Sequence, residues 1–126
     1  MLIDSDVMIW FYRGKERAQQ IIFQNIPFKL SAVSYMEIIQ GVRNKEELNK
    51  LKKDLKQWST EIIQINETIS KKAINLMEEY KLSHGLELGD AIIASTALEY
   101  DEPLITGNTK HYEYIPDIKF FSFKIS

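Results

Sequence analysis

Three acidic residues of this chain stand where a charge is costly. Asp4 follows a short apolar pair, Glu37 lies among apolar neighbours, and Asp90 begins the most apolar helical stretch. A buried carboxylate costs several kcal/mol unless hydrogen bonds or an opposite charge compensate it. Mg²⁺ and Mn²⁺ take oxygen ligands, so one such ion could compensate all three charges if the fold brings them together. These three residues are therefore our candidate metal ligands.

Each of these acids also has an ordinary structural interpretation. Glu37 follows Ser34 at the spacing of a helix capping box. Asp90 and Asp6 both fit the N-cap of a helix. Asp4 fits this interpretation least, because the apolar residues on both sides leave it little water. If all the acids only cap helices, the chain is a non-catalytic module that binds nucleic acid or a protein partner.

The segment LITGNTKHY, residues 104–112, adds a second group of polar side chains. Asn108 offers a carbonyl oxygen to a metal ion or its water, and Thr106 offers a hydroxyl. Lys110 and His111 could meet a phosphate or a leaving group. The ordinary interpretation is a turn followed by a surface histidine, because Gly-Asn is typical turn chemistry.

Short apolar segments alternate with helical patterns along the chain. Strands are predicted at residues 2–3, 28–33, 61–65, 104–106 and 118–123. Helices are predicted at residues 17–26, 34–42, 45–58, 67–82 and 90–100. This alternation predicts a three-layer α/β/α sandwich with a central, mainly parallel sheet. Ligands of such sheets bind beyond the carboxyl ends of the strands, which is where Asp4 stands.

Composition narrows the possible function classes. The chain has 126 residues, which suits one domain with its own core. The absence of cysteine excludes disulfides, thiolate zinc sites and cysteine nucleophiles. The net charge of −2 means that any basic surface for nucleic acid must be local. No apolar run approaches the ~20 residues that span a bilayer, and no basic-then-apolar leader is present, so we expect a cytoplasmic protein.

Four segments of the chain form an ordered set. They are LIDSDVMI (residues 2–9), SAVSYMEIIQG (31–41), LELGDAIIASTAL (86–98) and LITGNTKHY (104–112). In this order, and at this chain length, they resemble the PIN-domain ribonucleases, and most of all the VapC-type toxins of toxin–antitoxin pairs. Each segment alone is only a short apolar stretch with a polar residue, whereas the ordered set is specific. The resemblance implies one PIN-like nuclease domain over residues 1–126.

The same resemblance implies roles for individual residues. Asp4, Glu37 and Asp90 match the family's three acidic positions, and Asn108 matches the fourth, so these four are the expected catalytic residues. The three acids are the expected ligands of one or two Mg²⁺ or Mn²⁺ ions. Such ions lower the pKa of a bound water and stabilise charge on the scissile phosphate. The implied activity is metal-dependent endonucleolytic hydrolysis of RNA.

The resemblance also implies partners. Arg13, Arg43 and Lys110 are the local cations that we expect to contact the RNA backbone. A VapB-like antitoxin would cover the active site, and a homodimer is expected. The aromatic run Trp10-Phe11-Tyr12 could line the antitoxin groove, or it could belong to the core or to a homodimer contact.

A second enzyme class shares part of the pattern. Asp4-Ser5-Asp6 looks like the D-x-D pair of haloacid-dehalogenase-like phosphotransferases, in which Asp4 would be a covalent nucleophile. Gly89-Asp90 looks like the start of that class's G-D-x-x-x-D motif. The second acid of this motif is absent, because Ala94 stands at its position. This alternative is therefore weaker than the nuclease.

Overall fold

The computed structural model describes residues 1–125, which form a single parallel sheet and the helices that cover it. The strands are β1 (Leu2–Ile3), β2 (Lys29–Ser31), β3 (Glu61–Ile63), β4 (Leu104–Thr106) and β5 (Phe120–Ser122). The helices are α1 (Ser5–Tyr12), α2 (Glu16–Gln24), α3 (Ala32–Gln40), α4 (Lys45–Gln57), α5 (Glu67–His84), α6 (Leu88–Glu99) and the short 3₁₀ helix η1 (Thr109–His111). The strand order is β3-β2-β1-β4-β5, and every neighbouring pair is parallel.

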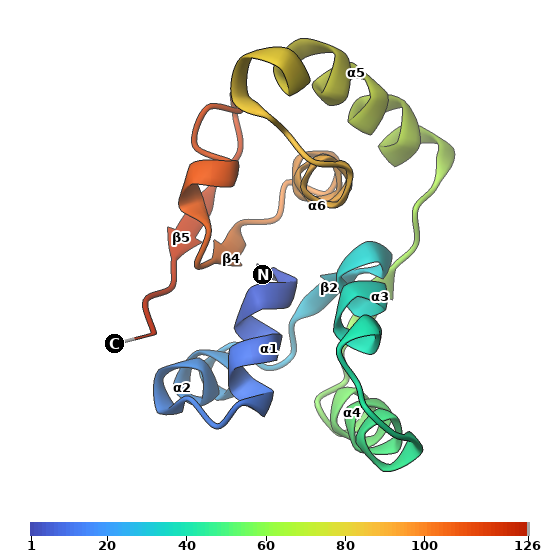
Figure 1. Ribbon diagram of the computed structural model, residues 1–126, viewed down its shortest axis with the longest axis vertical. Coiled ribbons are helices and arrows are strands. Elements are labelled where there is room, and N and C mark those ends of the chain that lie inside the picture. The colour runs from blue at the N-terminus through green and yellow to red at the C-terminus, as the bar shows by residue number, and fades with distance from the viewer. Residues whose placement is uncertain (126) are drawn as a thin grey trace.

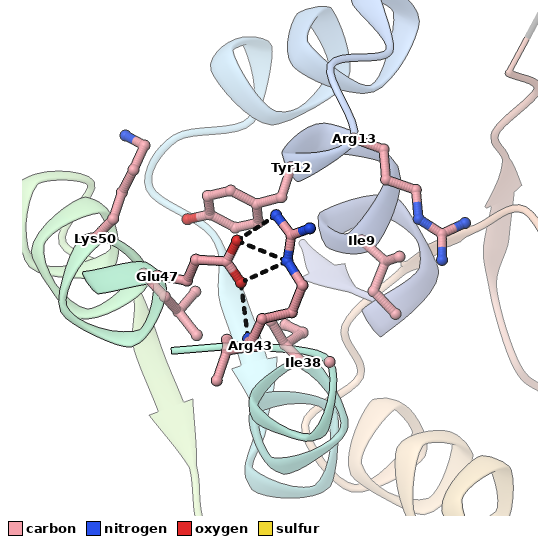
Figure 2. Close-up of a pocket in the computed structure, with 10 residues that line it drawn as sticks. Ile9, Tyr12, Arg13, Ile38, Arg43, Glu47 and Lys50 are labelled. Carbon is pink, nitrogen blue, oxygen red and sulfur yellow. Dashed lines mark hydrogen bonds and ion pairs between the residues drawn. The ribbon is translucent and has the colours of Figure 1, made fainter. Parts of the chain in front are cut away.

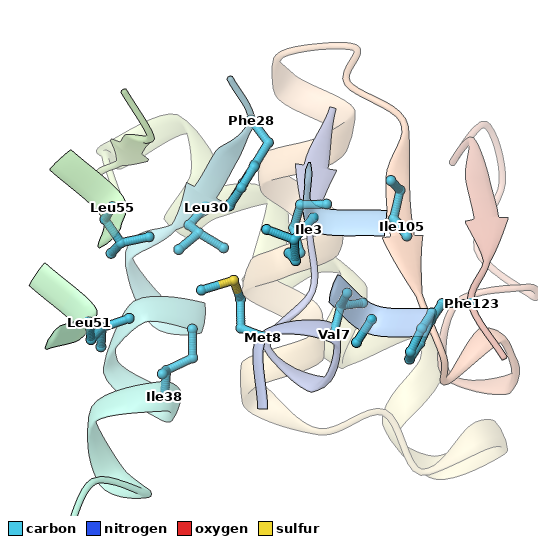
Figure 3. Close-up of a cluster of buried hydrophobic side chains, with 12 residues drawn as sticks. Ile3, Val7, Met8, Phe28, Leu30, Ile38, Leu51, Leu55, Ile105 and Phe123 are labelled. Atoms are coloured by element: carbon cyan, nitrogen blue, oxygen red, sulfur yellow. The ribbon is translucent and has the colours of Figure 1, made fainter. Parts of the chain in front are cut away.

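The helices lie on both faces of this sheet and make three layers (Figure 1). Successive residues of a strand point to opposite faces. Leu2 of β1 therefore packs with residues of α5 and α6, whereas Ile3 packs with residues of α1, α2 and α4. Figure 3 shows this second core, in which Met8 of α1 and Leu51 of α4 lie over the sheet. The predicted three-layer α/β/α sandwich is confirmed.

The connection from β1 to β2 differs from the prediction. The sequence pattern indicated one helix, over residues 17–26, but the structure has both α1 and α2 there. Residues 7–12 are apolar or aromatic without polar spacing, so they carry no amphipathic signal. The reason is that α1 packs against α2, α3 and β4 at once, and a helix with neighbours on several sides is apolar around its circumference.

The strand predicted at residues 28–33 is shorter in the structure. It ends at Ser31, and Ala32 and Val33 already belong to α3. The Ser31 side chain accepts a hydrogen bond from the Val33 amide and so caps α3. A serine cap inside an apolar run therefore converts the end of the predicted strand into the first turn of a helix.

The longest helix, α5, has defined ends. Its N-cap is Asn66, whose side chain accepts a hydrogen bond from the Ile69 amide. It ends at Gly85, which has φ +69° and lets the chain turn in the left-handed conformation that glycine adopts without strain. Within residues 1–125, no helix has both the length and the apolar character needed to cross a membrane.

The order of the strands reverses beside β1. The chain passes from β1 to β2 and β3 on one side, and then crosses through α5 and α6 to β4 on the other side. Ligands of open parallel sheets bind at this switch point, beyond the carboxyl ends of the strands. Asp4 directly follows β1 and Thr106 ends β4, so the fold places both residues at this position.

Candidate active site

Asp4 is the buried centre of the polar cluster at the switch point. Its side chain is only 3% exposed. Oδ1 accepts hydrogen bonds from the Ser5 amide at 2.7 Å and from Ser5 Oγ at 3.4 Å. Oδ2 accepts from Thr106 Oγ1 at 2.8 Å and from the Tyr112 hydroxyl at 3.0 Å. Burial raises the pKa of Asp4 in spite of these four donors.

Glu37 reaches the cluster from α3. The hydroxyl of Ser5 lies 3.1 Å from Glu37 Oε1, so one serine contacts the carboxylates of both Asp4 and Glu37. Burial, and then the charges of Asp4 and Asp90, raise the pKa of Glu37. Gly89 makes room for it, because a Cβ at this position would lie 3.0 Å from Glu37 Oε2.

Asp90 joins from the first turn of α6 and is held on both oxygens. The Tyr112 hydroxyl lies 3.1 Å from Asp90 Oδ1 and also contacts Asp4. His111 Nδ1 lies 3.0 Å from Asp90 Oδ2. Burial is the main cause that raises the pKa of Asp90, and it also raises the pKa of Tyr112 well above the ordinary range. Tyr112 thus ties two of the candidate ligands together.

Asp6 connects the first helix to the loop after β4. Its Oδ2 accepts hydrogen bonds from the Gly107 amide at 2.8 Å and from Asn108 Nδ2 at 3.3 Å, whereas the buried Oδ1 has no partner among residues 1–125. Burial and the nearby charge of Asp4 raise the pKa of Asp6 to about 7. The N-cap interpretation of Asp6 is wrong, because Asp4 caps α1.

Glycine at residue 107 allows the backbone to approach Asp6 closely. A Cβ there would lie 2.6 Å from Asp6 Oδ2 and 3.3 Å from the carbonyl oxygen of Phe123. Only a residue without a side chain allows the backbone to approach Asp6 this closely. The Gly-Asn pair is therefore more than a turn, since it brings Asn108 against the acidic cluster.

The capping interpretations of Glu37 and Asp90 are wrong as well. The N-cap of α3 is Ser31, which puts Ser34 and Glu37 within the helix and leaves no capping box between them. The N-cap of α6 is Glu87, which places Asp90 inside the first turn. Neither acid is needed to start its helix, so their burial beside Asp4 requires another explanation.

The cluster has the donor chemistry of a site for a hard divalent cation. No three acidic or histidine side chains of residues 1–125 already lie close enough together to hold an ion. The carboxylates are joined in pairs through the hydroxyls of Ser5 and Tyr112. All the candidate metal-ligand atoms are carboxylate oxygens. Asp6 Oδ1 has no hydrogen-bond partner among residues 1–125. Burial raises the pKa of all four carboxyls of the cluster. A bound cation would favour their charged forms.

A larger groove lies between α1, α3 and α4 (Figure 2). It has a volume of about 670 Å³ and combines apolar side chains with charged ones. Its lining residues include Ile9, Tyr12, Arg13, Ile38, Arg43, Glu47, Lys50 and Leu51. Arg43 donates to Glu47, with 2.7 Å between Nη2 and Oε2. Two of the three predicted RNA-contacting cations, Arg13 and Arg43, therefore share this groove.

The third predicted cation lies elsewhere. Lys110 lines a smaller pocket that also includes Asp90. The aromatic run at residues 10–12 is divided as well, since Tyr12 lines the groove while Trp10 and Phe11 pack against the core. The guanidinium carbon of Arg13 lies 5.0 Å from the centroid of the Trp10 ring, within cation–π range.

A parallel sheet with an acidic cluster at its switch point defines a class of α/β proteins, and comparison with known families gives the class its name. Residues 1–115 match the model of the PIN domain. The chain belongs to the PIN-domain family. It is 32% identical to Ribonuclease VapC10 from Mycobacterium tuberculosis over 94% of this chain and 90% of that protein. It is 28% identical to Ribonuclease VapC19 from the same species, over 94% and 96%.

Solved structures of other proteins have the same fold. A chain of a toxin–antitoxin complex from Klebsiella pneumoniae superposes with a TM-score of 0.79 and 30% identity, covering 93% of each chain. A chain of a DNA-bound VapBC from Salmonella typhimurium has a TM-score of 0.81 at 19% identity, with 96% of each chain covered. The second similarity concerns the fold alone.

Sequence reasoning missed two residues of the cluster. Tyr112 was not singled out, because an aromatic residue at the end of LITGNTKHY carries no sign that its hydroxyl is shared by two acids. His111 is 51% exposed, as expected of a surface histidine, but the sequence did not indicate that its ring contacts Asp90. The only signal in the sequence was that both residues closely follow Asn108.

Proposed function

We propose that this chain is a metal-dependent endoribonuclease and the toxin of a VapBC-type toxin–antitoxin pair. One observation carries the proposal: Asp4, Glu37 and Asp90 come from distant segments and are joined through two shared hydroxyl groups. Membership of the PIN-domain family supports it, as do the names of the relatives, Ribonuclease VapC10 and Ribonuclease VapC19.

We assign a divalent cation, Mg²⁺ or Mn²⁺, to Asp4, Glu37 and Asp90. When bound, the ion would lower the pKa of a water molecule and stabilise the charge that develops on the scissile phosphate. Asn108 stands next to these acids and contacts Asp6, so we assign it to orienting the water or the phosphate. Without a cation the carboxylates repel a phosphate, and the protein should be inactive.

The surrounding polar residues hold the acids in place. The hydroxyls of Ser5 and Thr106 donate to Asp4 and fix the direction of its carboxylate. His111 contacts one oxygen of Asp90, and Tyr112 contacts the other. Because these contacts restrain the acids before any ligand arrives, little reorganisation is needed when a substrate binds.

RNA would be held by cations that line two separate pockets. Arg13 and Arg43 lie in the larger groove, and Lys110 lines the smaller pocket beside Asp90. Cations of this kind contact the phosphate backbone without reading sequence. Single-stranded or looped RNA fits best, because its backbone can enter a narrow site. We also propose that the chain acts in the cytoplasm.

We propose that the antitoxin occupies the groove between α1, α3 and α4. The helices α1 and α3, which supply Asp6 and Glu37, form part of its wall, and the groove also holds Arg13 and Arg43, so a protein segment bound there would compete with RNA for these two cations. Its lining combines apolar and charged side chains, which suits an amphipathic helix. A homodimer is also proposed, supported by the exposed apolar side chains of Met36 and Leu88.

The phosphotransferase alternative fails on the geometry of Asp4. A nucleophilic carboxylate needs a free oxygen directed at the phosphorus atom. Each oxygen of Asp4 has two hydrogen-bond donors within reach, and the side chain is 3% exposed. A covalent intermediate on Asp4 is therefore disfavoured, whereas a buried carboxylate that shares a cation is compatible with this environment.

The proposal is tested by cleavage of single-stranded RNA by the purified chain. The reaction is followed with Mg²⁺, with Mn²⁺ and with EDTA, for the wild type and for Asp90→Asn and Glu37→Gln. Asp117→Asn is the matched control, because Asp117 is exposed, lies outside the cluster and has a positive φ that asparagine tolerates. We expect cleavage by the wild type and the control, and a loss of about a hundred-fold or more in the two cluster variants.

Thermal unfolding of each variant separates loss of chemistry from loss of fold. Cleavage that persists in EDTA, or that survives both cluster substitutions, would refute the metal-dependent mechanism. A wild-type chain that binds no metal and cuts no RNA would refute the nuclease as a whole.

A further inference from the structure

A second pocket lies beside the acidic cluster and shares Asp90 with it. We call it the His84 pocket; it lies between the end of α5, the turn into α6 and the segment from η1 to Tyr114. Its volume is about 140 Å³. This is well below the ~300–1,000 Å³ typical of pockets for drug-sized ligands, so the pocket has room for one planar ring rather than for a length of chain.

One wall of the pocket is a preformed aromatic stack. The rings of His84 and Tyr114 are nearly parallel, at 13°, with 4.1 Å between their centroids. Tyr80 packs against both, with centroid distances of 5.8 Å to His84 and 5.2 Å to Tyr114. The Ser83 hydroxyl lies 2.8 Å from His84 Nδ1, which fixes the orientation of the imidazole. Aromatic and imidazole rings held in this way are the usual stacking surface for an unpaired base.

The position of His84 depends on how α5 ends. Gly85 adopts φ +69°, so the chain turns sharply after His84 instead of continuing the helix. No atom lies within 4 Å of a Cβ built at Gly85, which leaves the space beside it open. The histidine side chain is exposed in spite of its stacking on Tyr114. A base can therefore extend the stack without displacing any part of the core.

The polar groups of the pocket match a nucleotide. Glu87 is exposed and can accept hydrogen bonds from the amino or imino groups on a base edge. Lys110 is exposed on the opposite segment and can pair with a backbone phosphate. His111 lines the pocket and contacts Asp90, so it connects the pocket to the acidic cluster.

From this arrangement we infer that the His84 pocket binds the nucleobase of a nucleotide adjacent to the scissile phosphate. The inference rests on the proposed nuclease function and adds a subsite to it. Because the pocket and the cluster share Asp90, the bound base belongs to a nucleotide next to the cleaved bond. The pocket would then give the enzyme a preference at one position beside the cut.

The test uses two substitutions of the same residue. His84→Ala removes the stacking ring, and His84→Phe keeps a ring but removes the polar nitrogens. Lys81→Ala, on the exposed face of the last turn of α5, is the control. Binding of a fluorescent, uncleavable 2′-O-methyl oligonucleotide is measured by anisotropy. Cleavage of a random-sequence RNA is mapped by sequencing in parallel.

We expect His84→Ala to weaken oligonucleotide binding and to raise KM by roughly ten-fold, which is the effect expected when one stacked base is lost. It should change kcat little and flatten the preference at one position beside the cut. His84→Phe should retain most of the binding, and Lys81→Ala all of it.

The outcomes separate this inference from the nuclease proposal. A wild type that cuts RNA, with His84→Ala equal to it in KM, in cleavage preference and in binding, overturns the subsite and leaves the nuclease intact. If the wild type cuts no RNA, the binding measurement still decides: weaker binding by His84→Ala supports the subsite, and equal binding overturns it. Loss of binding to the antitoxin with unchanged oligonucleotide binding would assign the pocket to a protein and overturn the inference.

Discussion

At the scale of single residues, the hydroxyls of Ser5 and Tyr112 join three carboxylates, those of Asp4, Glu37 and Asp90, in one small region. Each hydroxyl contacts two acids, but it has one proton and can donate to only one acid at a time. Some of the negative charge therefore stays uncompensated. Burial is the main cause that raises the pKa of all four carboxyls, those of Asp4, Asp6, Glu37 and Asp90. A divalent cation would supply the missing compensation.

Tyr112→Phe tests whether the Tyr112 hydroxyl and a bound cation compensate the same two acids, Asp4 and Asp90. The substitution keeps the buried ring but removes the hydroxyl between Asp4 and Asp90. Without metal we expect a loss of about 1–2 kcal/mol in the free energy of unfolding, because hydrogen bonds to charged groups are lost. In saturating Mn²⁺ the loss should shrink, since the ion then compensates the same two acids.

The measurement is urea unfolding with and without Mn²⁺, and Tyr100→Phe is the control because Tyr100 is 45% exposed. An equal loss in both conditions would mean that the Tyr112 hydroxyl supports the fold only and has no link to the cation.

For single residues, the sequence indicated candidate site residues most clearly where a charged residue lies next to apolar ones. Asp4, Glu37 and Asp90 stood out because a charge was next to apolar residues. Tyr112 did not, because a tyrosine in a core is ordinary and its role depends on two partners, one of them 108 residues away. Long-range contacts of this kind leave no local pattern.

At the scale of elements, the site depends on how closely α6 approaches α3. Gly89 lies in the first turn of α6, and a Cβ there would come within 3.0 Å of Glu37 Oε2. Alanine is a better helix former than glycine by about 1 kcal/mol. Glycine at residue 89 therefore makes α6 less stable than alanine would, but it leaves space for the Glu37 carboxylate.

Gly89→Ala should therefore separate stability from activity. We expect an unchanged or slightly higher melting temperature, because helix propensity improves while the flexible end of Glu37 moves aside. RNA cleavage should fall by about ten-fold or more, since a displaced acid no longer holds the geometry of the site. Full activity together with a shifted melting temperature would show that the position of Glu37 is not critical.

Among the helices and strands, the sequence pattern predicted the limits of two strands and missed one helix. The strands at residues 2–3 and 104–106 were predicted with their observed limits, because each is a short apolar run ended by a polar residue. Helix α1 was missed, because its apolar residues face several neighbours and show no helical period. Helix α6 is nearly as apolar, but its alanines have a high helix propensity and made it recognisable.

At the scale of the whole molecule, acidic groups lie at both ends of the parallel strands, and their pKa values shift in opposite directions at the two ends. At the carboxyl ends of the strands the acids lie close together, and their pKa values are raised. At the amino ends of the strands, Glu102 forms ion pairs with Lys29 and with the amino group of Met1. These partners lower the pKa of Glu102. A carboxyl whose pKa is lowered by folding stabilises the folded state above its unfolded pKa, and this contribution is lost as the pH falls through the lower, folded value.

Glu102→Gln should therefore be less stable than the wild type at neutral pH. The difference should begin to shrink as the pH falls below the ordinary glutamate pKa of 4.5, and it should disappear as the pH falls through the lower pKa of Glu102 in the folded protein. Thermal unfolding of both proteins between pH 7 and pH 3 measures this. Because the substitution is at the edge opposite the acidic cluster, Mn²⁺ binding should stay unchanged. A difference that is constant across this pH range would contradict the assigned role of the pair.

The proposed activity depends on one site formed by residues from three parts of the chain, and calorimetric titration of the metal-free protein with Mn²⁺ tests for this site most directly. We predict saturable binding by the wild type and by Asp117→Asn. Asp90→Asn and Glu37→Gln should each weaken binding by at least about ten-fold while the fold is retained. Equal binding by all four proteins, or no binding by the folded wild type, would contradict the claim that these acids share a cation.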